Sequence, residues 1–265
     1  MHSPENPYQA TGGTSPPPYR GGGLEYGRMV SFVFENPRWF VNLLLMGVCQ
    51  LIPIIGPMVV LGYQFDTVEA LHRDPRRRYP DFDFGRFVDY LVRGLWPFLV
   101  VLIASVILVP LMMGCSAAVI IGIGLAVAGA NTQSIGPMML TLLPLIILTA
   151  IVVGIGIQLL LLPLQLRAGL AQDFAAAFDF SFFKSFLATM WKEALVGMLF
   201  LAVVGVAAAI VGFAMCFIGI YLTMGVVMLA QANYYFQLYE LYLERGGQPI
   251  PLKPHVPAPL PRPQV

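Results

Sequence analysis

Three long blocks of the chain contain no Asp, Glu, Lys, Arg or His. They run from Trp39 to Phe65, from Gly94 to Leu166 and from Ala194 to Tyr239, and they are 27, 73 and 46 residues long. About 20 apolar residues are enough for a helix to cross a bilayer, so each block can hold one span or more. The pattern predicts an all-α, polytopic helical membrane protein.

Every charged residue lies outside these blocks, and Lys or Arg flanks each of them. Lys and Arg near membrane helices collect on the cytoplasmic side. If each block crosses the bilayer an even number of times, all of these residues share that side. We therefore expect about six membrane helices, arranged as three hairpins within residues 28–245. Both termini are then cytoplasmic at the cell (inner) membrane.

Two of the hairpins follow from breaks inside the first and third blocks. The third block divides into Ala194–Gly212 and Ile218–Tyr239. The first block carries Pro53-Ile54-Ile55-Gly56-Pro57 at its middle, where prolines interrupt a helix. This favours a tight hairpin, re-entrant if its short arms do not cross fully. A single span over residues 39–65 remains the alternative.

The second block is less regular. Helices are expected over Gly94–Met113 and Ile146–Leu166, with a far-side loop at the polar residues 131–137. Residues 115–130 admit two interpretations. They extend the first helix beyond Pro110, or they form a short membrane-embedded piece.

Two similar segments, Phe82–Leu95 and Phe178–Lys192, each begin with Phe-Asp-Phe. Their apolar residues recur at helical spacing, and in the first segment Arg86 and Arg93 lie opposite that stripe. An Asp at each start is suited to cap a helix. We predict two interfacial amphipathic helices on the cytoplasmic face, related by an internal repeat. The alternative to an internal repeat is that the similarity reflects only the general preference of Trp and Phe for membrane interfaces.

Composition adds to this picture. Of 265 residues, 58% are hydrophobic and 11% are charged, and the mean hydropathy is +0.76. Residues 1–27 are rich in Pro, Gly and Ser, and residues 246–265 hold seven prolines. Such segments bury too little apolar surface to offset the entropy of ordering, so both are predicted to be disordered tails.

Several motifs together resemble a known family. They include Leu51-Ile52-Pro53-Ile54-Ile55-Gly56-Pro57, the two Phe-Asp-Phe segments, Leu162-Pro163-Leu164 with Arg167, and Phe217-Ile218-Gly219. The set resembles the prokaryotic membrane family catalogued as domain of unknown function 4013, over approximately Tyr26 to Arg245. The resemblance implies a polytopic membrane protein, and it supplies no activity and no functional residue.

The best polar constellation is Asp66, Glu69, His72 and Arg73, which follows the first block. Glu69 and Arg73 are four residues apart, in the favourable order for a helical ion pair. Three interpretations stand beside one another: a solvated helix end, an ion or headgroup site, and a metal site. For a solvated end, Asp66→Leu is expected to be silent. No catalytic, cofactor-binding or metal-binding motif is recognisable, so we expect no cofactor and no enzymatic activity.

The expected partners follow from the same features. The bilayer is the first, and anionic lipid is attracted by Arg76, Arg77 and Arg78. A net charge of +1 does not indicate a nucleic acid. We expect a non-catalytic envelope or membrane-complex component with a possible membrane-protein partner. The alternative is a small transporter or channel-like protein, followed by a lipid-modifying enzyme that uses Asp66, Glu69 and His72.

Overall fold

A computed structural model describes residues 22–74, 78–128, 132–215 and 218–252 of the chain, and in these residues it is helical without strands. The helices are α1 (Tyr26–Glu35), α2 (Trp39–Gln50), α3 (Ile55–Arg73), the short 3-10 helix η1 (Phe84–Arg86), α4 (Phe87–Ala128), α5 (Thr132–Ala171), α6 (Phe174–Ala177), α7 (Phe180–Ala214) and α8 (Ile218–Glu244). The predicted all-α class is confirmed.

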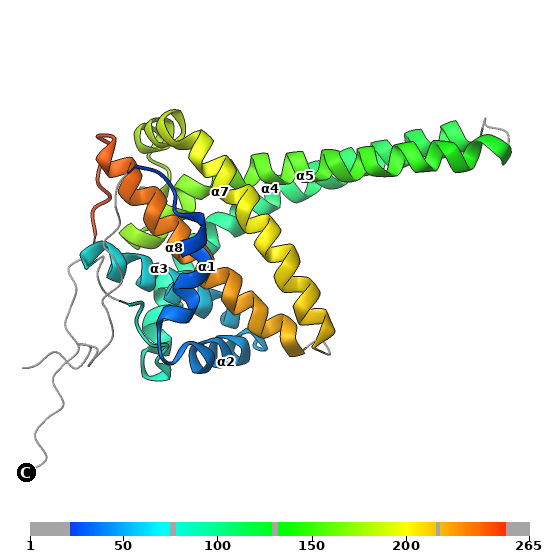
Figure 1. Cartoon of the computed structure of the whole chain (residues 1–265). Helices are drawn as coiled ribbons and strands as arrows, with labels where there is room; N and C mark the ends of the chain where they lie inside the picture. Colours follow the sequence, from blue (N-terminus) through cyan, green and yellow to red (C-terminus); the bar gives the residue numbers. More distant parts are fainter. Residues whose placement is uncertain (1–21, 75–77, 129–131, 216–217, 253–265) are drawn as a thin grey trace, which may run out of the picture.

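Helix α8 lies at the centre of the bundle, and α1, α2, α3 and α7 all pack against it (Figure 1). The core is rich in aromatic rings. Phe65 of α3 stacks on Tyr235 of α8, and Phe182 and Phe186 of α7 both contact Tyr242. These rings bury large apolar areas, so they dominate the packing energy of the bundle.

Helices α4 and α5 form a long antiparallel pair whose far ends extend away from the other helices (Figure 1). Helix α4 is 42 residues long and continues through both Pro97 and Pro110. Of the two interpretations of residues 115–130, the structure therefore selects the extension of the first helix as far as Ala128, where the described residues end. The predicted loop at residues 131–137 was too long, because α5 begins at Thr132. Ser and Thr are common both in loops and at helix starts, so the polar residues did not define the boundary.

The first block is broken where the prolines predicted. Helix α2 ends at Gln50, α3 begins at Ile55, and Ile54 between them has a positive φ of 68°. The chain turns back so closely that a Cβ on Gly56 would lie 1.8 Å from the carbonyl oxygen of Cys49. The third block is also divided as predicted, between Ala214 and Ile218.

The two segments predicted as separate interfacial helices are instead the first turns of longer helices. Residues 87–95 continue into α4, and residues 180–192 continue into α7. In the second segment Phe182 and Phe186 are buried, whereas Phe180 is 74% exposed. Contacts of α4 with α3 and of α7 with α8 decide which face of each segment is buried. The orientation of these segments relative to a membrane stays a prediction. The predicted N-caps are confirmed, because the Asp83 and Asp179 carboxylates accept backbone N–H bonds at 2.8 and 2.9 Å.

Within the described residues, three helical stretches are long and apolar enough to cross a bilayer: Phe84–Val106, Ile146–Ala171 and Phe180–Ala214. Helix α2 is apolar but shorter. Large apolar side chains on these helices face outward, for example Val106 at 67% and Val203 at 69% exposure. By length and composition, these features fit a membrane protein.

Residues 246–252, which we assigned to the C-terminal tail, pack back on α8. The side chain of Ile250 is buried in the core, and its N–H donates to the Tyr239 hydroxyl at 2.8 Å. The described end of the tail is thus anchored to the bundle. Of the predicted N-terminal tail, residues 22–27 are described, and Tyr26 and Gly27 already belong to α1, so the predicted boundary at residue 27 was too late. Residues 1–21 and 253–265 lie outside the described residues.

Candidate functional site: the α3–α4 charge cluster

The charged residues of α3 and α4 face each other across the interface between these helices. Asp66, Glu69 and Arg73 recur at three- and four-residue spacing and so share one face of α3. Arg86 and Arg93 are seven residues apart at the start of the η1–α4 segment and share a face as well. We call these five residues the α3–α4 charge cluster.

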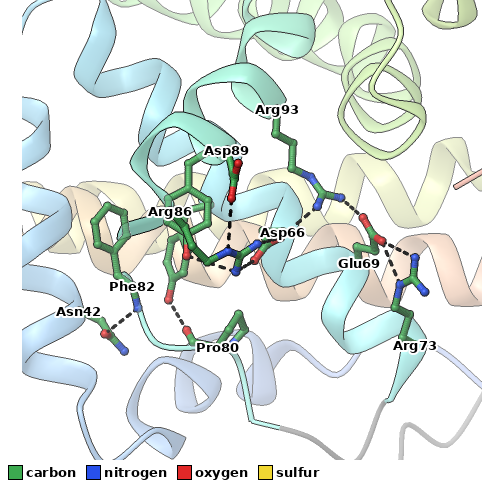
Figure 2. Close-up of polar contacts among 11 residues, drawn as sticks. Asn42, Asp66, Glu69, Arg73, Pro80, Phe82, Arg86, Asp89 and Arg93 are labelled. Carbon is green, nitrogen blue, oxygen red and sulfur yellow. Dashed lines mark hydrogen bonds and ion pairs between the residues drawn. The ribbon is translucent and has the colours of Figure 1, made fainter. Parts of the chain in front are cut away.

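The cluster is a chain of alternating charges in the order Arg86, Asp66, Arg93, Glu69, Arg73 (Figure 2). The Arg86 guanidinium donates two bonds of 3.0 Å to the Asp66 carboxylate, one to each oxygen. Arg93 donates to Asp66 at 3.1 Å through Nη1 and to Glu69 through Nη2. Arg73 donates to Glu69 Oε1 through Nε and Nη2, at 2.9 and 2.7 Å. Each acid therefore bridges two arginines.

Burial increases toward the middle of this chain. The Arg93 and Glu69 side chains are each 8% exposed, and Asp66 is 14% exposed. The outer members are more open, with Arg86 at 37% and Arg73 at 43%. A buried ion is costly unless it is paired and hydrogen-bonded. The two acids and the central Arg93 are paired with one another, so removal of any one of them leaves less opposite charge beside the others.

The chain segment between α3 and α4 holds the cluster in place. The Tyr63 hydroxyl donates to the carbonyl oxygen of Pro80 at 2.7 Å, and the Phe82 N–H donates to the Asn42 side chain at 3.0 Å (Figure 2). The Tyr79 hydroxyl donates to the Val33 carbonyl oxygen at 2.7 Å. Burial raises the pKa of the Tyr79 phenol, so it remains a neutral donor.

The structure brings three of the four predicted site residues together and separates the fourth. Asp66, Glu69 and Arg73 are in the cluster, and the expected Glu69–Arg73 pair is present. His72 lies on another face of α3, where its Nδ1 contacts the Glu240 carboxylate of α8. Arg76 and Arg77 lie outside the described residues.

Sequence reasoning missed Arg86 and Arg93 as partners of the acids. We had placed both arginines on an outer polar face. Their seven-residue spacing was a signal that they act together, because it puts them on one side of a helix. That this side of the helix packs against Asp66 and Glu69 of α3 is visible only in the fold. Arg86 also lies over the Tyr90 ring, 5.0 Å from its centroid, which fixes its direction.

One polar feature of α3 is unpaired. The Gln64 side chain is 1% exposed and Thr67 is 0% exposed, and within the described residues neither has a hydrogen-bond partner for its side-chain polar atoms. Buried polar groups without partners are uncommon and call for an explanation. In the part of the chain that the structure describes, no three His, Cys, Asp or Glu side chains are grouped to hold a metal ion.

These features define a helical protein whose apolar helices are long enough to cross a membrane. They do not define a reaction. The family model described as "Protein of unknown function (DUF4013)" matches residues 45–217. The chain belongs to this family, as the sequence motifs suggested, over a shorter range than residues 26–245. No curated protein and no solved structure matches the chain.

Proposed function

We propose that this chain is a non-catalytic, multi-pass component of the cell (inner) membrane that packs with a membrane-protein partner. The observation that carries the proposal is that the charged groups most suited to chemistry are paired with one another between α3 and α4. In that arrangement the cluster holds two helices together. It does not present a free acid or base to a substrate.

The shape of the described surface supports the same proposal. Two hollows on it, one between α5 and α7 and one beside Tyr26 and Phe200, are shallow and lined almost wholly by apolar atoms. Gln158, a polar side chain within the uncharged run of α5, is exposed on the outside of that helix. A transporter would need polar groups that converge in the interior of the bundle.

The α4/α5 pair is the surface that we assign to the partner. Val106 on α4 and Leu140 on α5 are 67% and 78% exposed, and the far ends of both helices project from the bundle (Figure 1). The uncharged runs 94–128 and 132–166 are each about 52 Å long at 1.5 Å per residue, against a hydrocarbon core of about 30 Å. Apolar helices of this length are stabilised by tilting or by packing against other helices.

Site-specific photo-crosslinking in native membranes tests this assignment. A photoreactive residue at Val106 or Leu140 is expected to give one reproducible protein adduct. The same residue at Val100, which is 2% exposed, is the control and should give none. Adducts to lipid alone at both exposed sites would contradict a protein partner.

A small transporter is the second candidate, and the unpaired Gln64 and Thr67 are the observation that favours it. Gln64→Leu removes a buried amide that lacks partners, so it should leave the fold intact or more stable. If the variant is stable and still complements a deletion strain, Gln64 has no transport role. Loss of complementation by a stable Gln64→Leu protein would favour the transporter.

A further inference from the structure

A shallow groove lies between α5 and α7. It is lined by Leu159 of α5 and by Phe183, Lys184, Leu187, Ala188 and Trp191 of α7. Its volume is about 450 Å³, within the range of roughly 300–1,000 Å³ that is typical of ligand sites. Five of the six lining residues are apolar, and Lys184 is the single charged one.

The charge of Lys184 has no protein partner among the described residues, although acids lie nearby on the same helix and just before it. Asp179 is paired with Arg167 at 2.7 Å, and Glu193 is paired with Arg245. Lys184 is exposed to the surroundings of the bundle. An anion from outside the chain would therefore complement it without competing with an existing pair.

The groove also has a direction. Lys184 lies near the start of α7, and Trp191 lies seven residues further on, about 10 Å along the helix axis. The uncharged run of α7 begins at Ala194, just beyond Trp191. Trp191 is 46% exposed, and Trp is enriched at membrane–water interfaces. One end of the groove is thus basic, and the other leads toward the hydrocarbon.

We propose that this groove binds an anionic phospholipid. Its phosphate pairs with Lys184, and an acyl chain lies along Leu187, Trp191 and Leu159. A zwitterionic lipid fits the apolar wall equally well, but it carries a cation that Lys184 repels. A basic residue near a membrane surface favours anionic lipid roughly fivefold. The inference rests on the proposed location in a membrane.

Trp191 reports directly on lipid in the groove. The full-length protein is reconstituted in phosphatidylcholine bilayers that contain an equal fraction of brominated phosphatidylglycerol or brominated phosphatidylcholine. The Trp191 signal is the fluorescence lost in Trp191→Phe, and each variant is normalised to its own signal in unbrominated lipid. We expect the apparent affinity for the brominated anionic lipid to be several-fold higher.

Two variants of α7 separate the groove from general charge attraction. Lys184→Gln should abolish the preference for the anionic lipid. Lys192→Gln removes the same charge from the same helix, but Lys192 lies over the Trp191 ring, 5.6 Å from its centroid, and does not line the groove. It should keep most of the preference. A circular dichroism spectrum and a melting curve show that both variants remain folded.

The outcomes distinguish this inference from the proposed function. Equal quenching by the two brominated lipids, or equal losses in the two lysine variants, would overturn the lipid site and leave the membrane location standing. Absence of quenching by either lipid would overturn the location of this face in a membrane and the lipid site with it.

Discussion

Gly62 of α3 and Gly94 of α4 lie opposite each other where the two helices approach most closely. A Cβ on Gly62 would lie 1.8 Å from the carbonyl oxygen of Tyr90, and one on Gly94 would lie 1.8 Å from that of Met58. The approach places Asp66, one turn beyond Gly62, within 3.1 Å of Arg93. The two glycines therefore set the distance at which the charge cluster forms, as small residues do in close-packed membrane helices.

Replacing either glycine by Ala should destabilise the bundle. Ala favours a helix by roughly 0.5–1 kcal/mol over Gly, but overpacking costs typically about 1–3 kcal/mol. Here the obstacle is backbone, which cannot rotate away, so the helices must separate and lengthen the Asp66–Arg93 contact. We expect Gly62→Ala and Gly94→Ala each to lower the thermal unfolding midpoint in detergent.

Gly205 of α7 supplies the control for this experiment, because a Cβ there meets nothing within 4 Å. Gly205→Ala should leave the midpoint unchanged or raise it slightly. If all three variants behave alike, the close approach of α3 and α4 is not what the substitutions report.

Asp66→Leu should be strongly destabilising, contrary to the silent outcome expected for a solvated helix end. The substitution leaves Arg86 and the 8% exposed Arg93 without their shared carboxylate. Removing one partner of a buried ion pair costs about 3–5 kcal/mol. Chemical or thermal unfolding in detergent should show a loss of this order.

Asp89→Leu is the matched control for Asp66→Leu. Asp89 also contacts Arg86, but at 3.9 Å and with 73% of its side chain exposed. Exposed pairs of this kind contribute about 0–1 kcal/mol, so this variant should unfold almost as the wild type does. Comparable losses at Asp66 and Asp89 would argue against an interior cluster.

Glu35 at the end of α1 should make stability depend on pH. Burial raises the pKa of its carboxyl above the ordinary value of 4.5, and the charges of Arg28 and Arg78 oppose this. Its Oε2 is buried and has no hydrogen-bond partner among the described residues. A carboxyl whose pKa is higher in the fold than in the unfolded chain favours the fold while protonated. That contribution is lost as the pH rises through the folded-state pKa.

Glu35→Gln should therefore raise the unfolding midpoint at pH 7.5, and the gain should shrink as the pH falls toward 4.5. Glu244→Gln at the exposed end of α8 serves as the control and should show no such trend. A gain at Glu35 that is independent of pH would contradict the electrostatic cause.

Both chain ends should face the same side of the membrane. The Glu25 N–H donates to the Gln237 side chain at 2.7 Å, so the start of α1 lies beside the last turns of α8. His72 at the end of α3 contacts Glu240, which also lies in the last turns of α8. Reporter fusions at the N-terminus, near residue 75 and after Arg245 should all read cytoplasmic. A periplasmic N-terminus with the other two cytoplasmic would require the first block to cross once.

The sequence by itself determined the helical class, the family, the break between α2 and α3 and the start of α8. These features have local signals in the sequence. The signals are the charge-free runs, the prolines of the Pro53–Pro57 break and the capping residues Asp83 and Asp179, and the prolines and caps act on the backbone within a few residues. The Glu69–Arg73 pair was predictable for the same reason, because both residues lie on one helix. What the sequence left open was which residues on different helices meet.

Only the tertiary structure decided the partners of Asp66 and the direction in which Arg86 and Arg93 point. The spacing of these arginines predicted that they share one face of a helix. Such a face can be exposed to water at the membrane surface, or it can pack against another helix. The close packing of α3 on α4 at Gly62 and Gly94 buries it, and a buried charge is then stable only beside an opposite one. Pairing between helices depends on this packing, which no local pattern along the chain contains.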